Sequence, residues 1–194
     1  SMTVVNQGEF TKPGSDMPAI TIGDANGDGQ NEIYGASFVD ASIYMFKYDA
    51  GSQKWGRTKL GSLGSGVRAM SLALGDGNTD GSSELYVGTS NNQVYKVFFD
   101  AASASWHSSA MGSGNGPING VAVGSATGDA AQTEVYAACL DGHGYQFVVD
   151  RTPPANPAVS SDTHPTPGTW YSANIVHVLW QDVGKDVSGI DGYS

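Results

Sequence analysis

The sequence predicts an all-β protein with three four-stranded, antiparallel, propeller-type blades, which form a partial or oligomer-completed β-propeller, followed by a truncated β-sandwich-like segment. Two observations support this fold class. A unit of roughly 50 residues occurs three times before residue 150. Within each unit, apolar and polar residues alternate, and Gly, Asn, Asp or Ser interrupt the pattern about every 8–12 residues, which is typical of short antiparallel strands.

Each unit has the same order of short motifs. An alternating segment ending in glycine comes first, then an acid, an apolar residue and a tyrosine, then a second tyrosine-containing strand. These segments are 20–23, 32–34 and 43–46 in the first unit, 72–75, 84–86 and 94–97 in the second, and 121–124, 134–136 and 144–147 in the third. In the first unit the predicted strands are at about 18–23, 32–39, 42–48 and 54–60.

Turns and tryptophans place the remaining strands. Asn91-Asn92 and Asp141-Gly142 are predicted hairpin turns in the later units, because these residue types favour tight turns. Trp55 and Trp106 mark the fourth strand of the first two units. No such strand follows Val149, and segment 3–10 instead has the pattern of an outer strand that begins the first unit.

A four-stranded unit that repeats can bury its apolar faces only against its neighbours, as a propeller blade does. Three blades are too few to close a ring, since propellers have about 4–8. The sequence therefore predicts part of a larger propeller, or a ring that other chains complete. Open blade edges also predict self-association.

Two loops have matching spacings of oxygen-bearing side chains. Acidic or amide side chains occupy positions 1, 3, 5 and 9, and glycine occupies position 6, which permits a sharp turn. The residues are Asp24, Asn26, Asp28 and Glu32 in the first loop and Asp76, Asn78, Asp80 and Glu84 in the second. Such donors suit a hard cation with six to eight oxygen ligands, which predicts two calcium (Ca²⁺) sites. The alternative is a metal-free turn, in which the clustered carboxylates would repel one another.

An EF-hand does not fit this spacing. Its twelfth loop position must be a bidentate glutamate, and Gly35 and Val87 stand there. A strand pattern follows each loop where an EF-hand would begin its second helix. Each loop is therefore expected to join two strands.

The pattern apolar-x-apolar-Gly-Asp-x-Asn-x-Asp-Gly-x-x-Glu-apolar-Tyr resembles the FG-GAP or VCBS-type repeat of integrin α-subunit propellers, bacterial surface proteins, some fungal lectins and some polysaccharide lyases. The resemblance covers residues 3 to about 150. It implies that the eight side chains above bind calcium and that Gln30 and Ser82 add backbone carbonyls. The family usually closes the loop with Asp, whereas Glu32 and Glu84 stand here. The third loop, 125–134, lacks the first carboxylate and the turn glycine, so this degenerate loop is expected to be metal-free or weak.

The chain divides into two predicted domains, 1–150 with the three blades and 151–194 with a Pro-rich linker and a second module. The second module resembles the opening of a bacterial Ig-like or fibronectin III-like domain, with Trp170 and Trp180 as core residues or, alternatively, exposed sugar-stacking residues. Such a sandwich needs about 100 residues, whereas 194 − 150 = 44 remain. The module is therefore predicted to be truncated or to pair with another body.

Composition excludes several function classes. The net charge of −10 and the pI near 4.5 argue against nucleic-acid binding, which needs basic patches. There is no apolar run of about 18 residues, so membrane insertion is not expected. Cys139 is predicted to be a small buried residue. Calcium loops of this type suit the calcium levels outside cells, which predicts a secreted or cell-surface location.

The sequence contains no catalytic constellation, and its four histidines have no ligand spacing. The predicted function is a non-catalytic, calcium-binding extracellular module of a larger surface or secreted protein. It would serve adhesion or the binding of a protein or glycan ligand, with Trp55 and Trp106 as sugar platforms or as fillers between blades. The alternative is the propeller portion of a polysaccharide lyase, similar to rhamnogalacturonan lyases. Its chemistry would need clustered cations, and the nearby ones are Lys12, Arg57, Lys59 and Arg68.

Overall fold

A computed structural model describes Met2 and residues 16–128, 133–148, 158–160 and 179–181. The chain divides into two compact units, Ser1–Val148 and Val149–Ser194. All regular secondary structure in the described part is β-strand, so the prediction of an all-β fold is confirmed. Within these residues no helix is long and apolar enough to cross a membrane.

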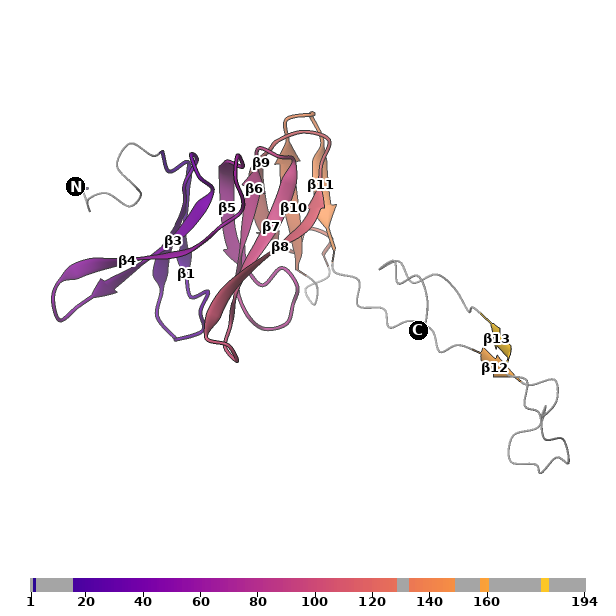
Figure 1. The fold of residues 1–194 in the computed structure, drawn as a ribbon, viewed down its shortest axis with the longest axis horizontal. Coiled ribbons are helices and arrows are strands. Elements are labelled where there is room, and N and C mark those ends of the chain that lie inside the picture. Colours follow the sequence, from indigo (N-terminus) through magenta and orange to yellow (C-terminus); the bar gives the residue numbers. More distant parts are fainter. Residues whose placement is uncertain (1, 3–15, 129–132, 149–157, 161–178, 182–194) are drawn as a thin grey trace, which may run out of the picture. The chain divides into compact units, whose positions relative to one another are not determined.

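The described residues of the first unit form three antiparallel sheets. The first sheet has β1 (Ala19–Gly23), β2 (Glu32–Ala36), β3 (Ser42–Asp49) and β4 (Lys54–Ser62) in chain order. The second sheet has β5 (Ala69–Gly75), β6 (Glu84–Thr89), β7 (Gln93–Asp100) and β8 (Ser105–Ser113) in chain order. The third sheet has β9 (Ile118–Gly124), β10 (Glu134–Cys139) and β11 (Gly144–Phe147), again in chain order. Among the described residues, none of these sheets closes on itself (Figure 1).

Two expectations about strands need correction. The second strand ends at Ala36 rather than at 39, because the Ser37 N–H turns to donate to the Ser42 carbonyl at 2.9 Å and closes the β2–β3 turn. The third sheet has three strands among the described residues instead of four. The predicted outer strand at 3–10 lies outside the described residues.

The sequence repeat is also a repeat of strand register. In each sheet the glycine that ends the first strand pairs with the glutamate that begins the second: Gly23 with Glu32, Gly75 with Glu84, and Gly124 with Glu134. Because side chains alternate between faces along a strand, equal register gives the three sheets equivalent faces.

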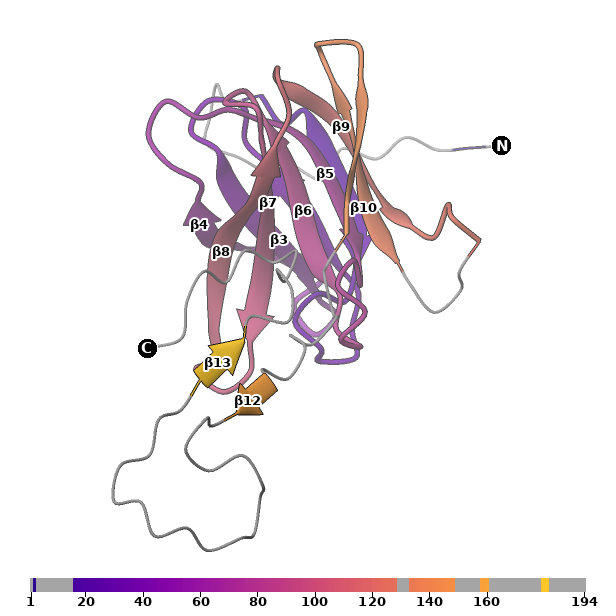
Figure 2. The same cartoon turned by 90° about the vertical axis from the view of Figure 1, so that its right-hand side faces the viewer.

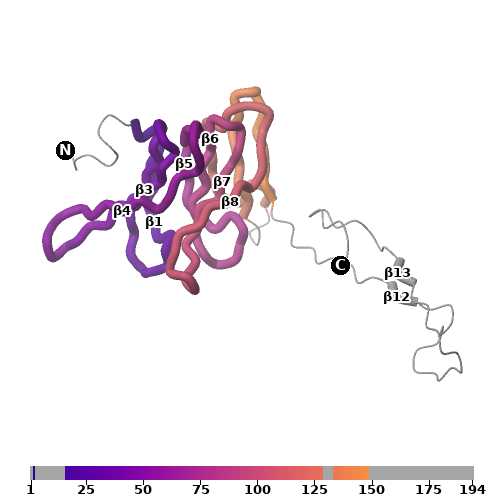
Figure 3. Tube along the Cα trace, in the orientation of Figure 1, coloured from indigo at the N-terminus to yellow at the C-terminus, as the bar shows by residue number. Residues whose placement is uncertain are grey.

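The three sheets pack face to face in chain order, as Figure 1 shows from indigo to orange and Figure 2 shows along the stack. The trace in Figure 3 completes one sheet before it enters the next, so each sheet consists of consecutive strands. One apolar core lies between the first two sheets and includes Tyr34, Ile43, Leu85 and Val87. A second core, with Tyr86, Ile118 and Val135, lies between the second and third sheets.

The fourth strands begin where the two tryptophans predicted them. Trp55 pairs with Tyr48 and Trp106 with Phe99. Trp106 packs against the core between the first two sheets, and its ring lies 6.1 Å from the Tyr34 ring. Cys139 is buried, and its thiol donates to the Gly116 carbonyl at 3.0 Å.

The second unit contains an antiparallel pair, β12 (Ala158–Ser160) and β13 (Leu179–Gln181), with Val159 opposite Trp180. Most of the predicted linker and sandwich-like segment, Trp170 included, lies outside the described residues.

Candidate metal centre

The first oxygen-rich loop closes the β1–β2 hairpin. Since Gly23 pairs with Glu32, the strand ends hold Asp24 and Glu32 close to each other. Gly27 and Gly29 have φ values of +72° and +81°, a region that residues with a Cβ rarely occupy. The two glycines therefore allow the tight bend between the strands.

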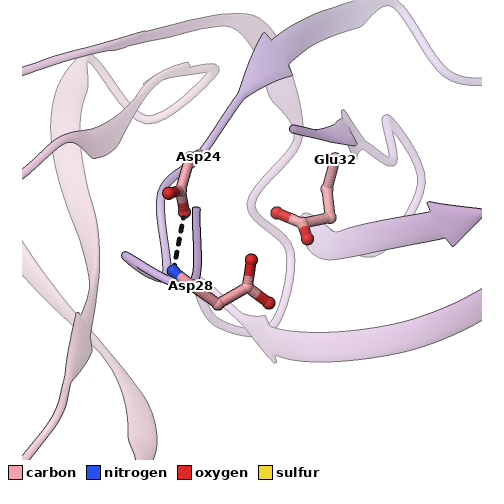
Figure 4. A group of neighbouring side chains, drawn as sticks. All are labelled: Asp24, Asp28 and Glu32. Atoms are coloured by element: carbon pink, nitrogen blue, oxygen red, sulfur yellow. Dashed lines mark hydrogen bonds between the residues drawn. The ribbon is translucent and has the colours of Figure 1, made fainter. Parts of the chain in front are cut away.

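Asp24 organises this loop by accepting backbone hydrogen bonds. Its Oδ1 accepts from the Gly27 N–H at 2.7 Å and its Oδ2 from the Gly29 N–H at 2.8 Å. Asp28 Oδ1 accepts from the Gln30 N–H at 2.9 Å. These bonds wrap the backbone around the acids, so that one ligand atom from each of Asp24, Asp28 and Glu32 lies within 4.8 Å of the others (Figure 4).

Glu32 is fully buried and is only partly satisfied by the protein. Its Oε2 accepts from the Tyr34 hydroxyl at 3.0 Å, and that hydroxyl accepts from the Ala25 N–H at 3.2 Å. Its Oε1 is buried without a hydrogen bond of acceptable geometry. A buried carboxylate oxygen is costly unless a positive charge faces it. The acids of the first loop therefore fit a bound cation.

Lys47 supplies a positive charge at this place. Its Nζ forms an ion pair with Asp28 Oδ2 and lies 3.1 Å from Glu32 Oε1, a distance that makes an ion pair although the hydrogen-bond angles are poor. The hydrogen bond from Lys47 lowers the pKa of Asp28, and the same bond raises the pKa of Lys47. The sequence motifs did not predict Lys47 as part of this site. The strand pairing could have located it. Phe46 pairs with Ile33, so the next residue of β3, Lys47, lies beside Glu32.

Asn26 completes the first loop in a structural role. Its Oδ1 accepts from the Asp28 N–H at 3.1 Å, and its Nδ2 donates to Asp28 Oδ2 at 3.3 Å. Gln30 contributes its N–H to Asp28, so the Gln30 carbonyl as a ligand stays a prediction.

The second loop repeats most of these bonds. Asp76 accepts from the N–H groups of Asp80 and Gly81 at 3.0 and 2.9 Å. The Ser82 N–H donates to Asp80 at 2.8 Å, which leaves the Ser82 carbonyl a prediction. Asn78 accepts from the Asp80 N–H at 3.2 Å.

The acids of the second loop are arranged more loosely. Glu84 is buried and accepts from the Tyr86 hydroxyl at 2.8 Å, and burial raises its pKa. Lys96 Nζ lies 3.8 Å from Glu84 Oε1. Within the described part of the chain, only the first loop brings three carboxylates within 4.8 Å of one another.

The third loop replaces a carboxylate with a hydroxyl. Glu134 is buried like Glu32 and Glu84, but it accepts from Thr127 Oγ1 at 2.8 Å and from the Tyr136 hydroxyl at 3.3 Å. Residues 129–132 lie outside the described part. In this loop protein hydroxyl groups meet both oxygens of the glutamate.

Two of the four cations weighed for a lyase lie over separate aromatic rings. The Arg57 guanidinium lies 5.6 Å from the centre of the Tyr44 ring, and that of Arg68 lies 5.1 Å from the centre of the Phe38 ring. Lys12 lies outside the described residues.

Comparison with known proteins adds information about the fold. No protein-family model matches the chain, and no curated protein matches it. Among solved structures, the chain is similar to a chain of "Chaetomium thermophilum Polycomb Repressive Complex 2 bound to GSK126", with a TM-score of 0.52 and 10% sequence identity. The match covers 73% of this chain and 30% of that one. At this identity the similarity concerns the fold alone.

Proposed function

We propose that this protein is a non-catalytic, calcium-binding module of the FG-GAP or VCBS type within a larger secreted or cell-surface protein, and that it serves adhesion or ligand binding. One observation carries the proposal: Asp24, Asp28 and Glu32 converge within 4.8 Å, and the buried Glu32 Oε1 atom has a positive charge, the Lys47 ammonium group at 3.1 Å, as its partner.

The donor set favours calcium over other metals. Every candidate ligand is an oxygen atom, whereas zinc and copper sites usually include nitrogen or sulfur. Magnesium requires nearly ideal octahedral geometry and keeps several waters, whereas calcium accepts six to eight oxygens in a flexible arrangement. A loop with three carboxylates and further amide and carbonyl oxygens suits calcium better.

Lys47 also bears on the compartment. Calcium must displace its ammonium group from Asp28 and Glu32, which lowers the apparent affinity of the loop. Extracellular calcium modules have dissociation constants of about 10⁻⁴–10⁻³ M, so a weakened site still fills outside the cell. The competition by Lys47 therefore supports an extracellular location.

Three stacked sheets of equal register support a propeller-type arrangement of blades, and the β3–β4 hairpin offers a candidate contact surface. Tyr48 is 47% exposed, and its ring lies 5.3 Å from the half-buried Trp55 ring. Paired aromatic rings at a surface suit glycan or protein ligands, because they offer contact area at low conformational cost.

Calcium titration by isothermal calorimetry tests the proposal. We expect saturable binding to the wild type and a loss of at least about tenfold in affinity at one site in Asp28→Asn, because the site loses one negative ligand. Asp49→Asn is the matched control: Asp49 accepts from Gly51 N at 2.8 Å in a turn outside the loops. Absence of calcium binding by the wild type, or equal losses in both variants, would refute the metal centre.

A further inference from the structure

The first strands of the three sheets, β1, β5 and β9, form an open-ended series. β5 packs on β1, and β9 packs on β5. Their sequences align as Ile-Thr-Ile-Gly at 20–23, Leu-Ala-Leu-Gly at 72–75 and Val-Ala-Val-Gly at 121–124. In each strand two bulky residues point to one face, and a small residue and a glycine point to the other.

The internal contacts follow a knob-and-hole rule. A Cβ placed on Gly23 would lie 2.9 Å from Leu74 Cδ2, and a Cβ placed on Gly75 would lie 2.8 Å from Val123 Cγ1. The second bulky residue of each strand thus occupies the space over the glycine of the preceding sheet. Leu74 packs against the first core and Val123 against the second.

Within the part of the chain that the structure describes, both ends of this series are open. The knob at the first end, Ile22, is 64% exposed, and its neighbour Ile20 is 53% exposed. At the other end, a Cβ placed on Gly124 would meet no atom within 4 Å. A shallow hollow on the third sheet continues this surface, and Gly120, Ala122, Tyr136 and Ala138 are among the residues that line it.

We propose that these two surfaces bind each other in two copies of this chain: β1 of one copy packs on β9 of the other, with Ile22 over Gly124. The contact continues a packing pattern that the fold already uses twice. Holes of the same kind already accept leucine and valine side chains, and isoleucine is of comparable size. The chain has a net charge of −10, but neither β1 nor β9 contains a charged residue. No charged side chains of these two strands would therefore face each other in the contact.

Such an interface is heterologous, because different surfaces meet. A reciprocal pair of copies places 3 + 3 = 6 sheets in one ring, within the range of about 4–8 for propellers. The closed ring of six sheets depends on the propeller arrangement that the proposed function includes. The docking of β1 on β9 depends only on the packing rule.

Sedimentation velocity of the full chain in calcium tests the docking. We expect the wild type at about 100 µM to sediment with twice the chain mass of 20.1 kDa. Ile22→Glu removes the knob and Gly124→Val fills the hole, so each variant is expected to be monomeric. Val39→Glu is the control, since Val39 is 61% exposed and lies in the β2–β3 turn.

A mixture of the two variants separates this geometry from a symmetric contact. Gly124→Val keeps its knob and Ile22→Glu keeps its hole, so mixing restores one interface and a species of doubled mass. A monomeric wild type, unchanged association in both variants, or no recovery on mixing of two folded monomers would overturn the docking. Calcium binding of the same variants is measured in a separate titration. Failure of the metal site then appears in the titration, and failure of the docking appears in the sedimentation.

Discussion

Lys47→Met removes the positive charge that lies between Asp28 and Glu32 and keeps an unbranched side chain. In the wild type the ammonium group forms ion pairs with both acids, at 3.1 Å to Glu32 Oε1. Calcium and Lys47 compete for the same oxygens in our account. The substitution is therefore expected to raise the calcium affinity of the first loop.

The size of the effect follows from the exposure of the partners. The side chains of Lys47 and Asp28 are 37% and 36% exposed, so solvent screens their attraction. An exposed ion pair changes an equilibrium by a factor of up to about five. The exposed Lys47–Asp28 pair alone therefore contributes up to about fivefold, and the pair with the buried Glu32 is screened less and adds to it, so we expect an increase of more than about threefold.

Calorimetric titration measures this change, and thermal unfolding with and without chelator provides a second reading. Without calcium the variant is expected to unfold at a lower temperature than the wild type, because buried Glu32 loses its counter-charge. Lys54→Met, on the exposed start of β4, is the control and should change neither reading. Unchanged or weaker calcium binding by Lys47→Met would show that the lysine and the ion do not share these ligands.

Two further variants test the packing and the electrostatics. Gly75→Ala is expected to destabilise the fold by about 1–3 kcal/mol in urea unfolding, because its Cβ would meet Val123. Gly124→Ala at the equivalent open position should be nearly neutral when unfolding is measured at a protein concentration low enough to keep the chain monomeric, and equal effects there would contradict the packing rule. The Tyr145 hydroxyl donates to Asp141 and holds the pKa of that carboxyl well below its usual range. The stabilisation that this hydrogen bond gives the fold is complete above the unfolded-state pKa of about 3.9. It is lost as the pH falls from there toward the pKa of Asp141 in the folded state. The stability difference between wild type and Asp141→Asn should therefore shrink between about pH 5 and pH 2 in denaturant titrations, and a constant difference would contradict this pairing.

Much of the fold could be predicted because local patterns fix it. Alternation and turn residues located the strands, and the matching motifs of the three units agree with the shared register that the structure shows, as Gly75 opposite Glu84 illustrates. The end of the second strand could not be predicted. It depends on a turn bond from Ser37 to the Ser42 carbonyl, which apolar alternation does not reveal.

The candidate site was predictable where its residues lie close in sequence. The spacing from Asp24 to Glu32 follows from one hairpin, and the structure brings these acids together. Lys47 was missed because it acts from another strand, and Thr127 because its loop departs from the pattern of the first two loops. Lys47 reaches the loop through the register of β2 and β3, and Thr127 reaches Glu134 across a loop of different length.

A crystal structure grown in millimolar calcium, with anomalous scattering to identify the ion, tests the central claim most directly. Our account predicts an anomalous peak at about 2.3–2.6 Å from carboxylate oxygens of Asp24, Asp28 and Glu32, with the Lys47 ammonium group moved away. An intact ion pair between Lys47 and Asp28, with no peak in the loop, would contradict it.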